Sequence, residues 1–268
     1  RSFHVTGVQT CALPISPGVP IALEDIEQAI MQLHPNKSVA CPYLPAIIWK
    51  SAPHEVACLI HQKLEAWWLS PAYPTGMAGC WLFFLPKPGK PGTHPRQMRP
   101  ISLMEPLGKL VLGLLTAQLK AFHLQRLCAE PHFGFLPKRS ALDAVRRVAT
   151  HCMEVRTLIA MQRRTIARQI ANPPQFTFCG GLQMYLDLRH AFDSVHRPRL
   201  FQHLKFLGTP EHLLHLITQW HIGTRYNLMH QGNTTSIDVN VGLRQGCKAA
   251  PLLWVLFMNH FLQQLTFH

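Results

Sequence analysis

Apolar residues recur along the chain at two spacings, which predict helices interrupted by a few strands. A spacing of three to four positions is clearest over residues 107–127, where leucines form a stripe along one side of a helix. Strict alternation is clearest over residues 182–188, as expected of a strand with one buried face. Further helices are predicted at residues 20–33, 52–69, 198–207 and 210–220, after Ser140, and in the final segment from about residue 250.

Prolines, glycines and polar residues mark where these elements begin and end. Residues 80–85 form a short apolar run that stops at a proline, which predicts a buried strand. The segment PKPGKPGTHPRQMRP that follows is so rich in proline and glycine that we expect no regular structure in it. Residues 225–230 and 234–241 flank a Gln-Gly-Asn turn, which predicts a β-hairpin. Ser140 and Asp143 have the spacing of a helix capping box.

The charge balance indicates what kind of molecule the folded chain binds. Of 268 residues, 26 are Lys or Arg and only 13 are Asp or Glu, which gives a formal charge of +13. Because such a surplus attracts polyanions, we expect a nucleic-acid partner, with an anionic membrane surface as the weaker alternative. The 47% of hydrophobic residues excludes a disordered chain, and no apolar run approaches the roughly 18 residues of a membrane span. The eight cysteines and 17 histidines show neither CxxC nor HExxH spacing, so no zinc site is predicted.

The two ends of the chain differ from its middle. Residues 1–16 have neither helical nor strand periodicity and lack the apolar core of a signal peptide. The string VTGVQTCALPIS within them resembles the translation of a sequencing adapter, so we interpret residues 1–16 as an artefact without a structural role. The last residue, His268, falls inside a helical apolar pattern. We therefore expect an open reading frame that is clipped at both ends.

Acidic residues are scarce, and one of the five aspartates stands where a catalytic carboxylate is useful. Asp187 lies at the end of the alternating segment, on the side opposite its apolar residues. A carboxylate there could hold a divalent cation against a polyphosphate, but from spacing alone an exposed aspartate in a salt bridge is the simpler alternative. Asp193 is favoured as the cap of the following helix or as the organiser of a turn. Gln245 and Gly246 lie in a tight loop, which an ordinary helix entry would also explain.

Basic residues gather in two further places. The proline-rich segment at 86–100 carries four Lys and Arg residues that could grip phosphate oxygens, and a merely solvated basic loop has equal support. The arginines of the helix after Ser140 are favoured as a solvated face, although the net charge raises the prospect of a nucleic-acid track.

Four segments of the chain form an ordered set of motifs: FFLPKPGKPGTHPRQMRPISL at 83–103, PHFGFLPKRSALDAV at 131–145, MYLDLRHAFDSV at 184–195 and GLRQGCKAAPLLW at 242–254. Read in this order, they resemble the reverse transcriptases of non-LTR (LINE-like) retrotransposons. A weaker match at 23–50 extends the resemblance from about residue 21 to the end. One such motif is moderately specific, whereas four in the family's order are highly specific.

The resemblance implies an α+β fold, the fingers and palm of a right-hand polymerase with an antiparallel palm sheet. Residues 17–180 would form the N-terminal segment and the fingers, and residues 181–268 would form a partial palm. The implied activity is RNA-directed DNA synthesis, in which two Mg²⁺ ions serve transfer of a nucleotide from a dNTP to a DNA primer on an RNA template. An intracellular protein with access to the nucleus and no membrane attachment is expected.

The resemblance also assigns roles to individual residues. Asp187 matches the first metal-binding aspartate of motif A, and the backbone carbonyl of Leu188 would join it at the ion. Phe192 matches the ring that excludes a 2′-hydroxyl from the incoming nucleotide. The remaining matches are Lys87 and Arg99 for the triphosphate, Gln245 and Gly246 for the motif B loop at the incoming nucleotide, and Arg139 for a template contact.

One departure from the family pattern affects the expected activity. The family's motif C, an aromatic–Ala–Asp–Asp turn that supplies the second-site metal ligands, has no match, because the sequence contains no Asp-Asp pair. We therefore expect a chain truncated before motif C and the thumb, and inactive by itself. The alternatives are a non-catalytic nucleic-acid-binding remnant and a reverse transcriptase of the group II intron type.

Overall fold

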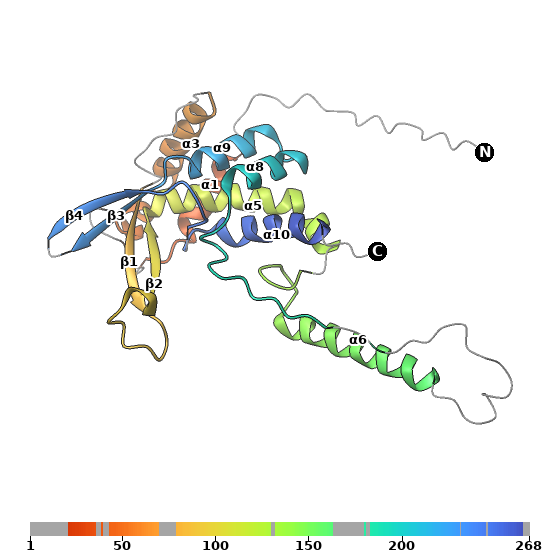
Figure 1. Cartoon of the computed structure of the whole chain (residues 1–268). Coiled ribbons are helices and arrows are strands. Elements are labelled where there is room, and N and C mark those ends of the chain that lie inside the picture. The colour runs from red at the N-terminus through yellow and green to blue at the C-terminus, as the bar shows by residue number, and fades with distance from the viewer. Residues whose placement is uncertain are drawn as a thin grey trace, which may run out of the picture. The chain divides into compact units, whose positions relative to one another are not determined.

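The computed structural model describes residues 21–35, 39, 43–69, 79–129, 132–162, 180, 183–230, 232–244 and 246–264. Figure 1 shows its helices and strands, coloured in chain order. The chain divides into two compact units, each assembled from two separate stretches. The first unit combines Arg1–Gln118 with Pro210–Asn240, and the second combines Leu119–Thr209 with Val241–His268. The expected boundary near residue 180 concerns function rather than packing, and it stays a prediction.

The helices of the first unit bury the apolar stripes that the sequence predicts. Helix α1 (Leu23–Met31) packs against α3 (Pro53–Leu69), with α2 (Ala46–Ser51) in contact with both. Ile26 and Ile30 of α1 are fully buried, as are Ala57 and Leu64 of α3. Two acidic residues occupy the first turn of α1, where the helix dipole favours negative charge. The predicted helices at 20–33 and 52–69 are thus confirmed, and α9 (Glu211–His221) confirms a third.

A four-stranded sheet in the order β2-β1-β3-β4 completes the first unit. Its strands are β1 (Cys80–Pro86), β2 (Met98–Met104), β3 (Arg225–His230) and β4 (Asn233–Asp238). The two hairpins are antiparallel, and the second confirms the predicted hairpin. However, β1 and β3 run parallel, with Cys80 opposite Tyr226. The described sheet is therefore mixed, because a parallel pairing joins the two hairpins. The resemblance implies an antiparallel sheet at the palm, and two strands of the described sheet, β1 and β2, fall in the part expected to form the fingers.

The expectation of no regular structure over residues 86–100 is wrong for its C-terminal part. Pro95–Gln97 form a short 3-10 helix, η1, and β2 begins directly after it at Met98. Strand β2 lies at an edge of the sheet, where a proline removes no hydrogen bond that a neighbouring strand requires. Pro100 is therefore tolerated inside the strand, and only the loop before η1 is irregular.

The second unit is helical. Helix α5 (Pro106–Ala129) contributes residues to both units, and α6 (Ala141–Gln162), α8 (Arg197–Phe206) and α10 (Ala250–Gln264) belong to the second. Helix α8 packs against α10. The capping box of α6 is confirmed, because the Asp143 backbone N–H donates to Ser140 Oγ and the Ser140 backbone N–H donates to Asp143 Oδ2 (3.3 and 2.8 Å). Across the described residues, no helix is both long enough and apolar enough to cross a bilayer.

The apolar residues of α6 do not form a packed face, contrary to their spacing. Leu142 and Val145 are 56% and 62% exposed, and Val148 is also exposed. The helix is therefore stabilised by its N-terminal cap and its own backbone hydrogen bonds rather than by burial of this stripe.

The predicted strand at 182–188 is not observed. Residues 183–188 have no regular structure, and Met184 and Leu186 are 70% and 72% exposed. Alternation makes a strand only where a neighbouring strand completes the backbone hydrogen bonds. Within the described ranges no strand pairs with this segment. The resemblance implies that its partner is the hairpin carrying the Asp-Asp turn, which the sequence does not contain.

Candidate functional site

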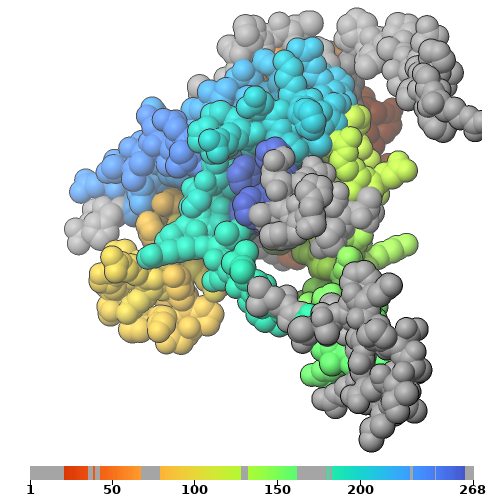
Figure 2. Space-filling model, turned by 45° about the vertical axis from the view of Figure 1, so that its right-hand side comes forward, coloured from red at the N-terminus to blue at the C-terminus, as the bar shows by residue number. Residues whose placement is uncertain are grey.

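The β1–β2 hairpin of the first unit carries the two residues expected to hold a triphosphate. Arg99 lies opposite Leu85 in the strand register, and the Lys87 backbone N–H donates to the Gln97 carbonyl at 2.8 Å. Lys87, which directly follows β1, and Arg99 of β2 therefore lie close together across the hairpin. Residues 80–104 contain four Lys and Arg and no Asp or Glu. These four cations are exposed, and Figure 2 shows the hairpin in yellow with its tip open to solvent.

Lys87 also makes a local bond that limits its reach. Its Nζ donates to the Arg96 carbonyl at 2.9 Å, so the ammonium group is held over the hairpin loop. This bond lies at an exposed position, where water competes with the carbonyl and the bond is weak. A phosphate group could therefore displace it without a large loss of free energy.

In the second unit, Asp187 lies in the irregular segment before the turn at 189–194. Its carboxylate is exposed and makes neither a hydrogen bond nor an ion pair within the described part of the chain. The salt bridge that spacing alone favoured for Asp187 is thus not found there. Leu188, next to it, is 47% exposed.

The oxygen donors of Asp187 and Leu188 are of the kind that Mg²⁺ prefers, but they do not complete a metal site. Among the described residues, no group of three or more Asp, Glu, His or Cys side chains gathers as metal ligands would. A single exposed carboxylate competes poorly with water for a divalent ion. The residues that the structure describes therefore do not by themselves fit the two magnesium ions that the resemblance implies.

The turn after Asp187 is joined directly to the loop before α10, although the two are about fifty residues apart in sequence. The Leu243 N–H donates to the Phe192 carbonyl at 2.8 Å, and the Gly242 N–H donates to the Val195 carbonyl at 2.9 Å. Gly242 has a φ of +78°, and a Cβ atom there would lie 2.7 Å from the Asp193 carbonyl oxygen. Backbone hydrogen bonds thus join the two segments that match motifs A and B.

Replacing Gly242 with Ala is expected to lower the free energy of unfolding by about 2 kcal/mol or more, because strain at positive φ adds to a backbone clash. Gly208 is a matched control, since its φ is +76° but a Cβ atom would meet nothing within 4 Å. Gly208→Ala should cost only the strain, about 1 kcal/mol. Urea unfolding of both variants tests this, and equal midpoints would show that the backbones at Gly242 and Asp193 are not in tight contact.

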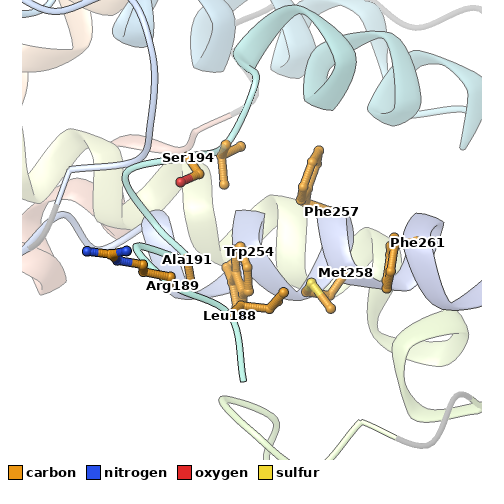
Figure 3. Close-up of a pocket in the computed structure, with 9 residues that line it drawn as sticks. Leu188, Arg189, Ala191, Ser194, Trp254, Phe257, Met258 and Phe261 are labelled. Carbon is orange, nitrogen blue, oxygen red and sulfur yellow. The ribbon is translucent and has the colours of Figure 1, made fainter. Parts of the chain in front are cut away.

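The Phe192 ring is held by aromatic neighbours. Its centroid lies 5.4 Å from that of Trp254 on α10 and 6.3 Å from that of Phe135. A mostly apolar pocket of about 170 Å³, which Phe192 does not line, lies between the same turn and α10 (Figure 3). Leu188 and Trp254 line this pocket, and the Arg189 side chain points away from Phe257 and Phe261. The contacts with Trp254 and Phe135 hold the Phe192 ring in place, as its proposed steric role requires.

The other predicted contacts are less defined. Gln245 lies outside the described residues, whereas its neighbour Gly246 is exposed with a φ of +98°. The Arg139 Nη1 donates to the His132 carbonyl at 2.6 Å, and its guanidinium lies 5.9 Å from the centroid of the Phe133 ring. Arg139 therefore stabilises its own loop, and its template contact stays a prediction.

The capping role considered for Asp193 is wrong. His196 occupies the N-cap of α8, where its Nδ1 accepts from the Arg199 N–H at 3.3 Å. Asp193 instead lies 3.9 Å from His190 across the exposed turn, which agrees with the other role considered for it.

Sequence reasoning missed two buried arginines of the second unit. Arg197 and Arg244 are 4% and 0% exposed. Arg197 is the first residue of α8, a position where the helix dipole disfavours a cation. That unfavourable placement is the signal in the sequence that could have marked Arg197 as a residue with another role.

Two buried histidines make the second unit sensitive to acid. His123 shares a hydrogen bond with Thr209 at 2.9 Å, and the His203 ring contacts the His260 ring at a tilt of 40°, with 4.3 Å between ring centroids. Burial lowers the pKa of His123 from 6.5 to about 4, helped by the positive charge of Arg126. Burial likewise lowers the pKa of His203 to about 4, with further contributions from His260 and Arg126.

Acidification from pH 7 to pH 5 is therefore expected to destabilise the fold by on the order of 2 kcal/mol. Because both folded-state pKa values are depressed, protonation favours the unfolded chain, and stability is lost as the pH falls from 6.5 towards 4. His203→Leu should flatten this dependence, whereas replacing the exposed His151 with Gln should leave it unchanged. Urea unfolding at the two pH values measures the difference, and an unchanged slope in His203→Leu would contradict the assignment.

Comparison with known proteins bears directly on this arrangement. Residues 85–268 match the family model described as reverse transcriptase (RNA-dependent DNA polymerase). The chain is 24% identical over 247 residues to the RNA-directed DNA polymerase from mobile element jockey of Drosophila funebris, an alignment that covers 90% of this chain and 24% of that protein. It is 25% identical over 249 residues to the probable RNA-directed DNA polymerase from transposon BS of Drosophila melanogaster, covering 92% and 25%.

A third relative is the putative 115 kDa protein in type-1 retrotransposable element R1DM of Drosophila melanogaster, which is 23% identical over 279 residues. The chain spans about a quarter of the length of these curated relatives. The family model covers well over half of the chain, including both segments joined at Phe192 and Gly242. The chain therefore belongs to the reverse transcriptase family, and within it to the LINE-like group of non-LTR retrotransposons.

Proposed function

We propose that the chain forms fingers and part of the palm of an RNA-directed DNA polymerase that extends a DNA primer on an RNA template. The junction of the motif A turn with the motif B loop carries this proposal. The bonds from Leu243 to Phe192 and from Gly242 to Val195 bring together the two segments that must meet at an incoming nucleotide. In this assignment Asp187 is a ligand of catalytic Mg²⁺, and the remaining carboxylates come from elsewhere in the full-length protein.

The β1–β2 hairpin supplies the second part of the proposal. Lys87 and Arg99 bind the triphosphate, for which exposed cations without a neighbouring acid are suited. Arg139 contacts the template, and Gln245 and Gly246 contact the nucleotide and the templating base. Because base pairing selects the nucleotide, these side chains need to recognise charge and backbone shape rather than sequence.

Primer extension by the full-length protein tests this function. DNA synthesis should require an RNA template, a DNA primer with a free 3′-hydroxyl, dNTPs and Mg²⁺. Withholding the template or the metal should each abolish it. Failure of the folded full-length protein to extend any primer under these conditions would refute the proposal.

For the 268 residues alone we propose nucleic-acid binding without synthesis. The charge of +13 favours a polyanion, and the described residues gather no group of three or more side chains that could hold a metal ion. RNA affinity should fall steeply as salt rises and should not depend on Mg²⁺ beyond its ionic strength. Mg²⁺-dependent incorporation of dNTPs by this chain would contradict the proposal.

A further inference from the structure

Arg197 connects the two segments that form the proposed nucleotide site. Its Nε donates to the Gly242 carbonyl at 2.7 Å, and its Nη2 donates to the Val241 carbonyl at 3.2 Å. The guanidinium therefore bridges two successive carbonyls of the loop that leads to Gln245. Both donors belong to one planar group, so the two bonds fix the orientation of that loop as well as its distance from α8.

The turn before α8 holds the same loop through backbone hydrogen bonds. Gly242 and Leu243 donate to the carbonyls of Val195 and Phe192. The carbonyl of Gly242 accepts from Arg197. Gly242 thus bonds through both its N–H and its C=O, and its α-carbon is too close to Asp193 for any side chain. A shift of the loop would break these bonds together rather than singly.

Arg197 lies where its charge destabilises helix α8 rather than stabilising it. A cation at the first position of a helix is unfavourable, because it opposes the positive end of the helix dipole. The side chain is also 4% exposed, so its charge is removed from water. The carbonyls of Val241 and Gly242 compensate for both effects, which indicates that the position of this loop is what the arginine serves.

We propose that Arg197 is a positioning residue that fixes the motif B loop against the backbone of Phe192 and so determines how well the site distinguishes dNTPs from ribonucleotides. This inference rests on the proposed function. The link is direct, because the carbonyl of Phe192 accepts from Leu243, which directly follows the glycine that Arg197 holds. Loss of the guanidinium loosens the loop, and with it the hold of Gly242 and Leu243 on the backbone of the turn that carries Phe192.

The test compares Arg197→Gln, Arg197→Lys and the control Arg199→Gln in the full-length protein. Arg199 lies on the same helix two residues further on and is exposed. Single-nucleotide primer extension with a dNTP and with the matching rNTP gives kcat and KM for each. We expect Arg197→Gln to raise the KM for dNTP and to narrow the dNTP preference in kcat/KM, each about tenfold, with a much smaller change in kcat.

Arg197→Lys keeps the charge and can still donate to one of the carbonyls, so it should recover part of both effects. Arg199→Gln should behave as the wild type does. A folded Arg197→Gln variant with wild-type KM and wild-type sugar preference would overturn the inference while the proposed function stands. If both Arg197 variants fail to fold, the arginine serves the fold rather than the site, and the inference is equally overturned. A wild-type protein that synthesises no DNA would remove the proposed function itself.

Discussion

Replacing Asp187 with Asn in the full-length protein is expected to reduce DNA synthesis roughly a thousandfold or more. Asparagine has nearly the same shape as aspartate but no charge, so the variant removes the affinity of this side chain for a divalent cation. The carboxylate is exposed and bonds to nothing within the described residues, so the fold should not depend on it. The melting temperature should therefore remain at the wild-type value while primer extension is lost.

Glu154→Gln is a suitable control, because it neutralises another exposed carboxylate of the same unit. Its synthesis rate should equal that of the wild type. Binding of Mn²⁺, followed by its paramagnetic effect on the protein, provides a measurement independent of turnover and should weaken only in Asp187→Asn. Wild-type synthesis by Asp187→Asn would exclude Asp187 from the catalytic machinery.

The helices were predictable because a helix completes its backbone hydrogen bonds within its own segment, so its spacing pattern is local. The stripe at 107–127 places Leu110, Val111 and Leu115 on the buried face of α5, where they are at most 2% exposed. Helix spacing determines this face before any partner is known. Proline in the first turn of α8 and glycine at positive φ after it bounded that helix correctly.

Strands were harder to predict because a strand depends on a neighbour. The alternation at 182–188 is real, yet residues 183–188 form no strand, since none of the described strands pairs with them. Conversely, β2 forms despite Pro100, because β1 completes one side and the other side lies at the edge. Pairing over long sequence separations, such as β1 with β3, leaves no local signal in composition or spacing.

In the candidate site, too, local patterns were predictable from the sequence and contacts between distant segments were not. Asp187 and Phe192 were identified through a motif, which needs only the order of residues along the chain. Arg197 and Gly242 act through contacts that connect the motif A turn to the motif B loop, so their roles appear only once the backbones meet. An unfavourable local choice, such as a cation at the start of a helix, is the trace that such contacts leave in a sequence.

Replacing Phe192 with Val in the full-length protein is expected to raise incorporation of ribonucleotides by about tenfold to a hundredfold, with a much smaller change for dNTPs. The proposed role of the ring is steric, since it occupies the space that a 2′-hydroxyl would need. Valine removes most of that volume and leaves the backbone unchanged. Because the carbonyl of Phe192 still accepts from Leu243, the motif A and B segments should remain joined.

The structure also predicts a second effect that separates this role from general damage. Phe192 packs against Trp254 and Phe135, so the variant should lose about 1–3 kcal/mol of stability through lost aromatic contact and burial. Phe135→Leu removes one of the same aromatic contacts without altering the proposed position of the sugar, and it avoids a β-branched side chain at the φ of +60° of Phe135, so it serves as the matched control. It should be destabilised but should still reject rNTPs. Equal relaxation of sugar preference in both variants would show that loosened packing, rather than the ring of Phe192, controls discrimination.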